Sequence, residues 1–220
     1  MFIARLKSEP ELFYSLQGEG VSAGEPAVFL RLAGCNLHCS WCDTKHSWGG
    51  GLSMDVQDIA SRLCSYPCRR YVITGGEPLL QAAELEKLLA LLPDEAYLEV
   101  ETNGTLPPTQ ALADRVQQWN VSPKLPHAGN AEEQACLPHA LAAFAALPGS
   151  WFKFVVQGEQ DWPAIEALRL PLDKIILMPC ADNRADLQSR LPDVADMALR
   201  HGVRLGNRLH ILLWDRTPGV

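Results

Sequence analysis

Three cysteines that directly follow an apolar run constrain this chain more than any other feature. The run extends over residues 27–33 and is broken only by Arg31. The chain then reads Cys-Asn-Leu-His-Cys-Ser-Trp-Cys, so the thiols of Cys35, Cys39 and Cys42 are spaced as C-x3-C-x2-C. Soft thiolate ligands select zinc, copper(I) or an iron–sulfur cluster. This loop can therefore close three thiolates around one inorganic centre.

The missing fourth ligand leaves two interpretations open. Tetrahedral zinc and cubane clusters both normally take about four protein ligands. Either His38 or His46 completes a structural zinc site, or one metal keeps an open position. An open position is typical of a site that binds another molecule, so the spacing favours a cofactor site over a zinc knuckle or buried apolar thiols.

Length and composition predict one cytoplasmic domain. The chain has 220 residues, of which 47% are apolar, enough to bury one substantial core. No apolar run approaches the roughly 18 residues of a membrane span, and the N-terminus lacks the apolar stretch of a signal peptide. We therefore expect no membrane association. The odd number of cysteines, 7, then predicts reduced thiols and no disulfide framework.

The net charge limits the possible partners. At a formal charge of -7 the chain offers no broad basic surface for nucleic acid, which is bound through clustered Lys and Arg. A single anionic substrate remains compatible, because Arg31, Lys124 and His210 could suffice for it locally.

Short apolar runs alternate with amphipathic segments along the whole chain. We expect an edge strand near residues 2–6 that leads into a loop, and strands at 27–33, 71–74, 97–100, 119–121, 151–156 and 174–178. The expected helices cover 54–66 with Ser53 as N-cap, 79–92, a region ending at 147 and restarted by Pro138, a short helix near 165–168, and 187–198 with a kink at Pro192. This alternation predicts a parallel sheet with right-handed crossovers.

The motifs lie where such a sheet binds ligands. Cys35, Gly75, Thr102 and Ser122 each follow the end of an expected strand. The carboxyl ends of parallel strands meet at one edge, so one mouth should collect all of these residues. The strands are too few for a complete eight-fold barrel.

Several motifs together resemble the 7-carboxy-7-deazaguanine synthase family of radical S-adenosylmethionine (SAM) enzymes. The resemblance runs from Phe13 to His210 and implies an α/β fold. The implied architecture is a partial (β/α)6-type radical SAM barrel, abbreviated and laterally open, as a single domain over residues 1–220. The motifs are Leu16-Gln17-Gly18-Glu19-Gly20, Arg31-Leu32-Ala33-Gly34-Cys35-Asn36, Trp41-Cys42-Asp43-Thr44-Lys45-His46, Thr74-Gly75-Gly76-Glu77-Pro78, Glu101-Thr102-Asn103-Gly104-Thr105 and Ser122-Pro123-Lys124.

The resemblance also implies a reaction. Enzymes of this family convert 6-carboxy-5,6,7,8-tetrahydropterin to 7-carboxy-7-deazaguanine with loss of ammonia, in queuosine and 7-deazapurine biosynthesis. Cys35, Cys39 and Cys42 would hold a 4Fe-4S cluster whose fourth iron is chelated by SAM. An electron from the cluster breaks a carbon–sulfur bond of SAM and starts radical chemistry. An electron donor such as flavodoxin and a homodimer are further expectations.

The resemblance assigns the cofactor contacts residue by residue. Trp41 and Asp43 would line the adenine side of SAM, and Glu77 would orient the turn that meets its amino group. Glycines in that turn let a backbone approach a ligand closely. The expected cofactor contacts are Trp41, Cys42, Asp43, Gly75, Gly76, Glu77, Thr102, Ser122, Pro123 and Lys124.

The substrate side rests on a few polar groups. Glu19 could accept two of the N–H donors on a pterin edge, and Arg31 offers a planar fork to the substrate oxygens. A charge in an apolar strand is costly, so Arg31 either pairs with a carboxylate or faces a ligand. The expected catalytic residues are Cys35, Cys39, Cys42, Glu19 and Arg31. The expected substrate contacts are Leu16, Gln17, Gly18, Glu19, Arg31, Thr74 and His210.

Thr44 corresponds to the magnesium ligand of the family. One hydroxyl, a substrate carboxylate and waters make a reasonable shell for this hard, octahedral ion. The family's terminal carboxylate reaches the substrate pocket, but here the chain continues for 10 residues past His210 to Val220, so that role is not assigned.

The remaining cysteines and two competing functions complete the sequence expectations. Cys64, Cys68, Cys136 and Cys180 fit buried or surface thiols better than a second cluster. One competing function is a different radical SAM enzyme that acts on a protein, such as a glycyl-radical activase, against which residues 17–20 and Thr44 argue. The other is a non-catalytic zinc or iron–sulfur protein, which colour and bleaching by dithionite would distinguish from a cluster enzyme.

Overall fold

A curved, mostly parallel sheet organises the molecule. The computed structural model describes residues 1–220, and its 10-stranded sheet has the order β12-β11-β10-β9-β8-β7-β5-β1-β6, with β4 also paired to β5. The segment from β5 to β12 is parallel, whereas β1, β4 and β6 are antiparallel to their neighbours. The strands are β1 Phe2–Ile3, β4 Leu12–Leu16, β5 Pro26–Leu32, β6 Leu52–Ser53, β7 Arg70–Gly75, β8 Tyr97–Thr102, β9 Gln118–Val121, β10 Ser150–Val156, β11 Ile175–Pro179 and β12 Arg204–Leu205, beside a separate hairpin of β2 Arg5–Leu6 and β3 Glu9–Pro10.

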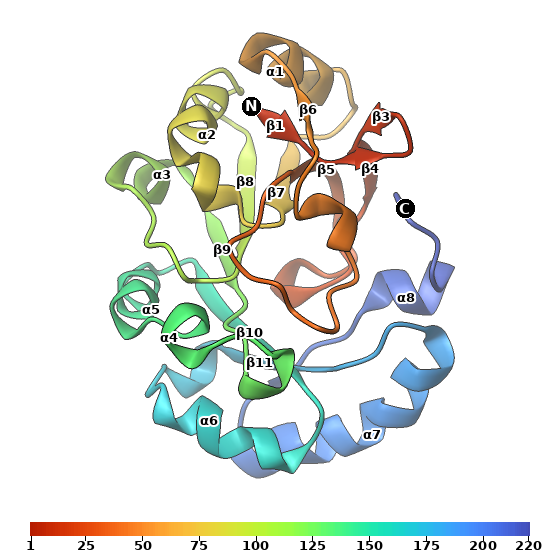
Figure 1. The fold of residues 1–220 in the computed structure, drawn as a ribbon, viewed down its shortest axis with the longest axis vertical. Coiled ribbons are helices and arrows are strands. Elements are labelled where there is room, and N and C mark those ends of the chain that lie inside the picture. Colours follow the sequence, from red (N-terminus) through yellow and green to blue (C-terminus); the bar gives the residue numbers. More distant parts are fainter.

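The helices surround the outer face of this sheet, as Figure 1 shows. They are α1 Val56–Cys64, α2 Ala82–Leu89, α3 Gln110–Arg115, α4 Glu132–Ala135, α5 Pro138–Ala145, α6 Trp162–Ala167, α7 Arg184–His201 and α8 Leu209–Trp214. The sheet ends in different strands, β12 and β6, so the barrel is partial and laterally open as expected. None of the helices combines the length and hydropathy that a membrane span requires.

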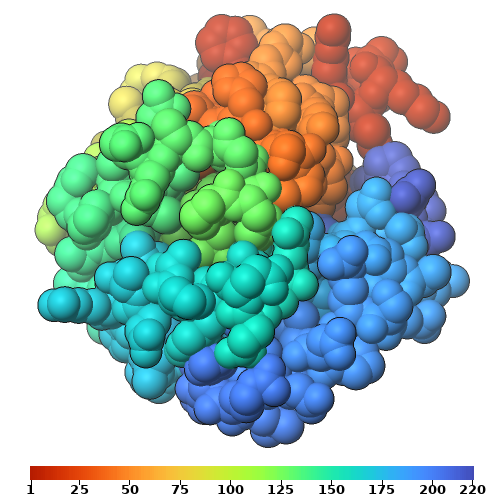
Figure 2. Space-filling view, turned by 60° about the horizontal axis from the view of Figure 1, so that its bottom comes forward, coloured from red at the N-terminus to blue at the C-terminus, as the bar shows by residue number.

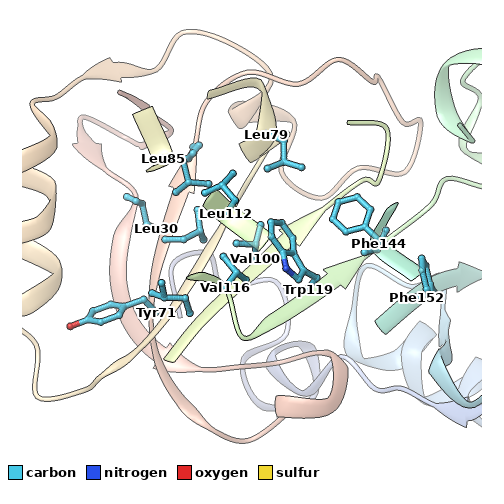
Figure 3. Packing of buried hydrophobic residues seen from close by; sticks show 14 of the residues in the cluster. Leu30, Tyr71, Leu79, Leu85, Val100, Leu112, Val116, Trp119, Phe144 and Phe152 are labelled. Atoms are coloured by element: carbon cyan, nitrogen blue, oxygen red, sulfur yellow. The ribbon is translucent and has the colours of Figure 1, made fainter. Parts of the chain in front are cut away.

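One apolar core joins the sheet to the helices. Its 36 buried residues range along the chain from Met1 to Ala198. Tyr71, Trp119 and Phe144 are among its largest fully buried side chains, and Figure 3 shows them packed between the strands and the helical layer. Burying a side chain of this size contributes roughly 1.5–3 kcal/mol, which explains why the outward strand faces are apolar.

The inward face of the sheet carries buried polar side chains at β8 and β9, beside small apolar clusters on its other strands. On β8, Leu98 and Val100 belong to the outer core, whereas Glu99 and Glu101 alternate with them and do not. Gln118 lies beside Glu99 on the next strand and is also buried. Side chains alternate along a strand, so these polar residues all face the interior of the barrel.

The N-terminal expectations were partly wrong. The strand near residues 2–6 is not at the edge, because β1 lies between β5 and β6. The segment expected as a loop contains β4, whose five residues pair with β5 from Leu12↔Leu30 to Leu16↔Pro26. The apolar alternation of β4 is short and is satisfied only by contact with a distant strand, so local pattern alone did not reveal it.

The first helix begins later than expected. Ser53 pairs with Phe2 in β6, so its backbone is extended and it does not cap the helix. Asp55 is the N-cap, and its carboxylate accepts the N–H of Gln57 at 2.8 Å. Helix α7 is continuous over Arg184–His201 and contains Pro192, while α3 and β12 were not expected.

Candidate active site

One cavity collects the expected residues at the carboxyl ends of the parallel strands. It is lined from strands β4, β5, β7, β8, β9 and β10, from the cysteine loop and from the C-terminal segment. Glu77 and Pro123 are the two expected residues that do not line it. The expected residues on its walls are Leu16, Gln17, Gly18, Glu19, Arg31, Cys35, Cys39, Trp41, Cys42, Asp43, Thr44, Thr74, Gly75, Gly76, Thr102, Ser122, Lys124 and His210.

The three thiols of the cysteine loop face this cavity. Cys35 accepts the N–H of Leu37 at 3.4 Å, and Cys39 accepts the amide N–H of Asn130 at 3.1 Å. Burial raises the pKa of the Cys35 thiol. The protein by itself does not draw the thiols into a group of metal-ligand geometry. Three thiols on one cavity, without a fourth protein ligand among them, still match the donor set of an iron–sulfur cluster that is completed by another molecule.

A segment at residues 126–130 supports the cysteine loop from outside. Ser40 donates its backbone N–H to Ala128 at 2.9 Å, and Trp41 donates its indole N–H to Nδ1 of His127 at 3.1 Å. His127 must then carry its proton on Nε2, which lies 3.1 Å from the carbonyl oxygen of Val155. Figure 2 shows the orange loop and the green segment lying against each other on one face. His127 had no signal in the sequence.

The two glycines of the Gly-Gly-Glu-Pro turn serve the protein's own packing. A Cβ at Gly75 would lie 2.3 Å from the carbonyl oxygen of Leu32, and one at Gly76 would lie 2.2 Å from that of Gly34. No side chain fits there, so the end of β7 packs directly on the end of β5 and on the start of the cysteine loop. The sequence explained these glycines by the close approach of a ligand, whereas the structure shows that the close approach of two backbone segments already requires them.

Glu77 fixes the same turn from behind. It is fully buried and accepts hydrogen bonds from the N–H of Asn103 at 2.7 Å, from the hydroxyl of Thr102 at 2.8 Å and from the N–H of Leu79 at 2.9 Å. Burial raises its pKa despite these donors. Glu77 thus ties the turn after β7 to the turn after β8 and acts from outside the cavity.

Two cations that sequence reasoning missed hold Glu19. Its Oε2 pairs with the ammonium of Lys153, and its Oε1 accepts Nε–H of Arg208 at 3.0 Å. Arg208 also pairs with Asp43 in the cysteine loop. Burial by itself would raise the pKa of Glu19, but the charges of Lys153 and Arg208 outweigh it and hold that pKa far below its usual range. Glu19 is therefore an ionised acceptor throughout the physiological pH range.

Arg31 is paired with a carboxylate, the first alternative raised by the sequence, and it also lines the cavity. Its Nε donates to Glu11 at 2.8 Å, so the charge in the apolar strand is paired. Glu11 is itself buried and is shared with His46 at 2.7 Å. Arg31 nevertheless lines the cavity, where its terminal nitrogens remain available for a ligand.

Gln17 is committed within the protein to a greater extent than expected. The residue is 1% exposed, and its amide nitrogen donates to Glu99 at 2.5 Å and to Glu101 at 3.2 Å. Its amide oxygen accepts the N–H of Glu19 at 3.1 Å. Gln17 shapes the wall that presents Glu19.

The C-terminal segment closes the remaining wall. His210 packs so tightly on Gly18 that a Cβ there would lie 2.1 Å from its Nδ1. Burial lowers the pKa of His210, which keeps the imidazole neutral at pH 7. Despite the longer C-terminus, Val220 also lines the cavity, because the chain turns back after α8.

Comparisons with known proteins agree with this geometry. A profile described as the radical SAM superfamily matches residues 30–122. The chain is 41% identical over 217 residues to the 7-carboxy-7-deazaguanine synthase of Pyrobaculum aerophilum, with 95% of each chain covered. This chain belongs to the 7-carboxy-7-deazaguanine synthase family. The family member of Halobacterium salinarum is 38% identical over 236 residues, covering 94% of this chain and 90% of its own.

Solved structures support the same assignment for the fold. QueE from Escherichia coli aligns with a TM-score of 0.68 at 29% identity, covering 90% of this chain and 92% of its own. SuiB from Streptococcus suis aligns with a TM-score of 0.55 at 13% identity, which concerns the fold alone. Membership of the 7-carboxy-7-deazaguanine synthase family makes this chain a radical SAM enzyme, which uses a 4Fe-4S cluster and SAM.

The other cysteines lie away from the cavity of this family member. Cys64 and Cys68 pack against the main core, and Cys180 packs against a small cluster around Val155. Cys136 is close to the carbonyl oxygen of Lys124 at 3.3 Å. All four are free thiols, and they lie in separate parts of the fold.

Proposed function

We propose that this chain converts 6-carboxy-5,6,7,8-tetrahydropterin to 7-carboxy-7-deazaguanine with loss of ammonia, in queuosine and 7-deazapurine biosynthesis. Membership of the family supports the product. The observation that carries the proposal is that Glu19 and Arg31 share one cavity with the three thiols of the cysteine loop. A carboxylate for the pterin edge and a guanidinium for its oxygens thus stand within one enclosure with the cluster ligands.

The cysteine loop would hold the cofactors. Cys35, Cys39 and Cys42 would each bind one iron, and the bound cluster and SAM supply the radical that begins the reaction. The other expected cofactor contacts, Trp41, Asp43, Gly75, Gly76, Glu77, Thr102, Ser122, Pro123 and Lys124, would position SAM beside them.

Two contacts support the place of SAM. The ammonium of Lys124 donates to the hydroxyl of Ser122 at 2.8 Å and lies 5.5 Å from the centre of the Trp41 ring. Burial lowers the pKa of Lys124, so an anionic partner such as a carboxylate would stabilise its charged form. The pairing of Asp43 with Arg208 holds the other end of this wall.

The substrate would lie between Glu19 and Arg31. Glu19 keeps acceptor capacity beyond its two ion pairs, because a carboxylate has about four lone-pair sites. Thr74 is beside Arg31 in the β5–β7 register and lines the cavity, and neutral His210 can donate or accept. Leu16, Gln17 and Gly18 would form the adjoining wall, so that the reacting part of the pterin is held in a fixed orientation and water is excluded.

Further parts of the proposal concern magnesium and partners. The hydroxyl of Thr44 lines the cavity 3.6 Å from the sulfur of Cys42 and caps no helix, which leaves it available to Mg2+. An oxygen ligand of this kind together with a substrate carboxylate suits that ion. An electron donor such as flavodoxin, a homodimer and a cytoplasmic location complete the proposal.

An anaerobic assay tests the function. Reconstituted protein is supplied with the carboxylated tetrahydropterin, SAM, magnesium and a reductant, and product is identified by its mass and absorbance. Formation of 7-carboxy-7-deazaguanine by the wild type, and not by Cys35→Ala, is the expected result. Protein that holds its cluster and cleaves SAM but leaves the pterin unchanged would refute the proposed substrate.

A further inference from the structure

A buried carboxylate lies beneath the substrate cavity. Glu99 stands in the middle of β8 on the inward face of the sheet, is 0% exposed and does not line the cavity. The strand register places it between Val72 of β7 and Gln118 of β9. A buried charge is costly unless hydrogen bonds and opposite charges satisfy it, so its partners reveal what it does.

Glu99 has three polar partners from three parts of the chain. Its Oε1 accepts the amide N–H of Gln17 and the amide N–H of Asn120, each at 2.5 Å. Its Oε2 lies 3.4 Å from a terminal nitrogen of Arg70, and the same nitrogen donates to the hydroxyl of Ser22 at 3.3 Å. These partners connect Glu99 to the turn at residues 17–22.

Each connection reaches a different point of that turn. Gln17 accepts the N–H of Glu19 at 3.1 Å on the oxygen opposite to Glu99. Asn120 lies against Gly20, where an added Cβ would be 3.0 Å from its amide oxygen. Ser22, at the far end, is held by Arg70 and also donates to Gln118 at 2.8 Å. The beginning, middle and end of the turn therefore all rest on groups around one carboxylate.

We propose that Glu99 is a positioning residue for the pterin, which holds the turn at residues 17–22 in the shape that presents Glu19 to the substrate. This inference rests on the proposed function of the cavity.

The chemical reason lies in the orientation of an amide. Two acceptors, Glu99 and Glu101, face the nitrogen of Gln17, which forces its oxygen toward the N–H of Glu19. Replacing Glu99 by an amide puts an NH2 group where one oxygen was, and protonation puts an O–H there. Either change places a hydrogen-bond donor opposite the donors that face the carboxylate. The amide of Gln17 could then rotate and set N–H against N–H at Glu19, and the turn would loosen.

The charges around Glu99 predict a dependence on pH. Burial and the neighbouring charge of Glu101 raise the pKa of Glu99 to about 7, and Arg70 opposes this rise. Glu99 is thus ionised above that pH and protonated below it, so substrate affinity should fall as the pH falls through about 7. The charged groups facing Glu99 are Arg70 and Glu101; its other neighbours are Gln17 and Ser22 of the turn, Gln118 and Asn120 of β9, and Tyr97, whose ring lies under Arg70.

The first experiment replaces Glu99 in the reconstituted enzyme. Glu99→Gln should raise the KM for the pterin by about tenfold, as expected for loss of a hydrogen bond to a charged group, while kcat, iron content and SAM affinity stay near wild type. Glu95→Gln removes the same charge from an exposed turn that precedes β8 and should change none of these. A Glu99→Gln enzyme with the KM of the wild type would overturn the proposal.

The second experiment follows the KM for the pterin over pH. The wild-type KM should rise below about pH 7, and the KM of Glu99→Gln should lose this transition. Arg70→Gln removes the cation that favours ionised Glu99, so the transition should move to higher pH. If the KM of Arg70→Gln changes at the same pH as that of the wild type, the proposal is wrong. This test remains available if Glu99→Gln fails to take up a cluster. A wild type that leaves the pterin unchanged would instead refute the proposed function.

Discussion

At the scale of single residues, the site depends on how its charges are paired. Glu19 is held by Lys153 and Arg208, and Arg31 is held by Glu11. Such pairs fix the side chains in one orientation before a ligand arrives, which reduces the entropy lost on binding. A buried ion pair also makes each partner sensitive to loss of the other.

Glu19→Gln should weaken substrate binding and leave SAM cleavage intact. The amide puts a donor opposite the N–H donors of the pterin, and it leaves Lys153 and Arg208 with an uncharged partner. A hydrogen bond to a charged group is worth about 1.5–3 kcal/mol, so a roughly ten- to hundred-fold rise in the pterin Kd is expected. Binding measured on the reconstituted enzyme tests this, and an unchanged Kd would remove Glu19 from the substrate site. The pKa of Glu19 lies far below neutrality, so Glu19 itself stays ionised at physiological pH, and any change of substrate affinity near pH 7 must come from the titration of another group.

Thr44→Val tests the magnesium ligand. Valine keeps the shape of threonine but cannot coordinate, so fold, cluster and SAM affinity should be retained while the response of turnover to magnesium is lost. The apparent magnesium affinity of the wild type should rise when the pterin is present, because binding of two ligands at one site is mutually linked. If the magnesium titrations of wild type and variant coincide, Thr44 is only a turn residue.

At the scale of elements, the cysteine loop is placed by backbone contact between strand ends. Gly34 N–H donates to Ser47 at 2.7 Å, and Glu77 N–H donates back to Gly34 at 2.8 Å. The start of the loop is thus clamped between its own C-terminal part and the turn after β7. The geometry of the cluster ligands therefore depends on the turn after β7, which itself contributes no cysteine.

Gly76→Ala should damage this arrangement. Its methyl group would lie 2.2 Å from the carbonyl oxygen of Gly34 and 2.8 Å from Cβ of Cys35, so the loop must move. Overpacking of this kind costs about 1–3 kcal/mol, which lowers Tm by roughly 2–12 °C for a protein of this size. Iron content after reconstitution should fall together with Tm. Gly49→Ala is the matched control, because nothing lies within 4 Å of the added Cβ; normal iron content in Gly76→Ala would argue against the clamp.

At the scale of the whole molecule, the N-terminal half of the chain and its last segment meet at the site. The N-terminal half supplies the cysteine loop and the turn at residues 17–22, while Arg208, His210 and Val220 come from the last segment. Leu209 donates its N–H to the carbonyl oxygen of Gly18 at 2.8 Å, which joins this segment to the turn. Figure 1 shows the C-terminus on the same side of the molecule as β3 and β4.

Removal of residues 216–220 should separate substrate binding from folding. Residues 215–219 are exposed, so Tm and iron content should change little. Val220 lines the cavity, so its removal should take the terminal carboxylate away from the pterin. The KM for the pterin should then rise by roughly tenfold, the effect of one lost hydrogen bond to a charged group. The KM for the pterin and the affinity for SAM are measured for the truncated and the full-length enzyme, and only the KM should differ. A truncated enzyme with unchanged KM would show that the terminal residues take no part in the site.

Sequence alone determined where the motifs would meet. Apolar runs that end in Cys35, Gly75, Thr102 and Ser122 predicted parallel strands, and parallel strands bring their carboxyl ends to one edge. That argument needs only local patterns and a topological rule, and the cavity confirmed its result. The short elements α3 and β12 escaped prediction, because 6 and 2 residues carry too little periodicity to be recognised.

Only the tertiary structure decided which groups hold the site residues in place. Lys153 is 134 residues from Glu19, and Arg208 is 189 residues from it. In the sequence, Glu99 is a single charged residue in a short strand, and only the strand register shows that it lies beneath the turn at residues 17–22. Such pairings depend on strand order and on which face of a strand turns inward, and both are fixed by burial of the outer core as a whole. A local pattern contains no information about them, because the same residue on the other face would meet solvent or a helix.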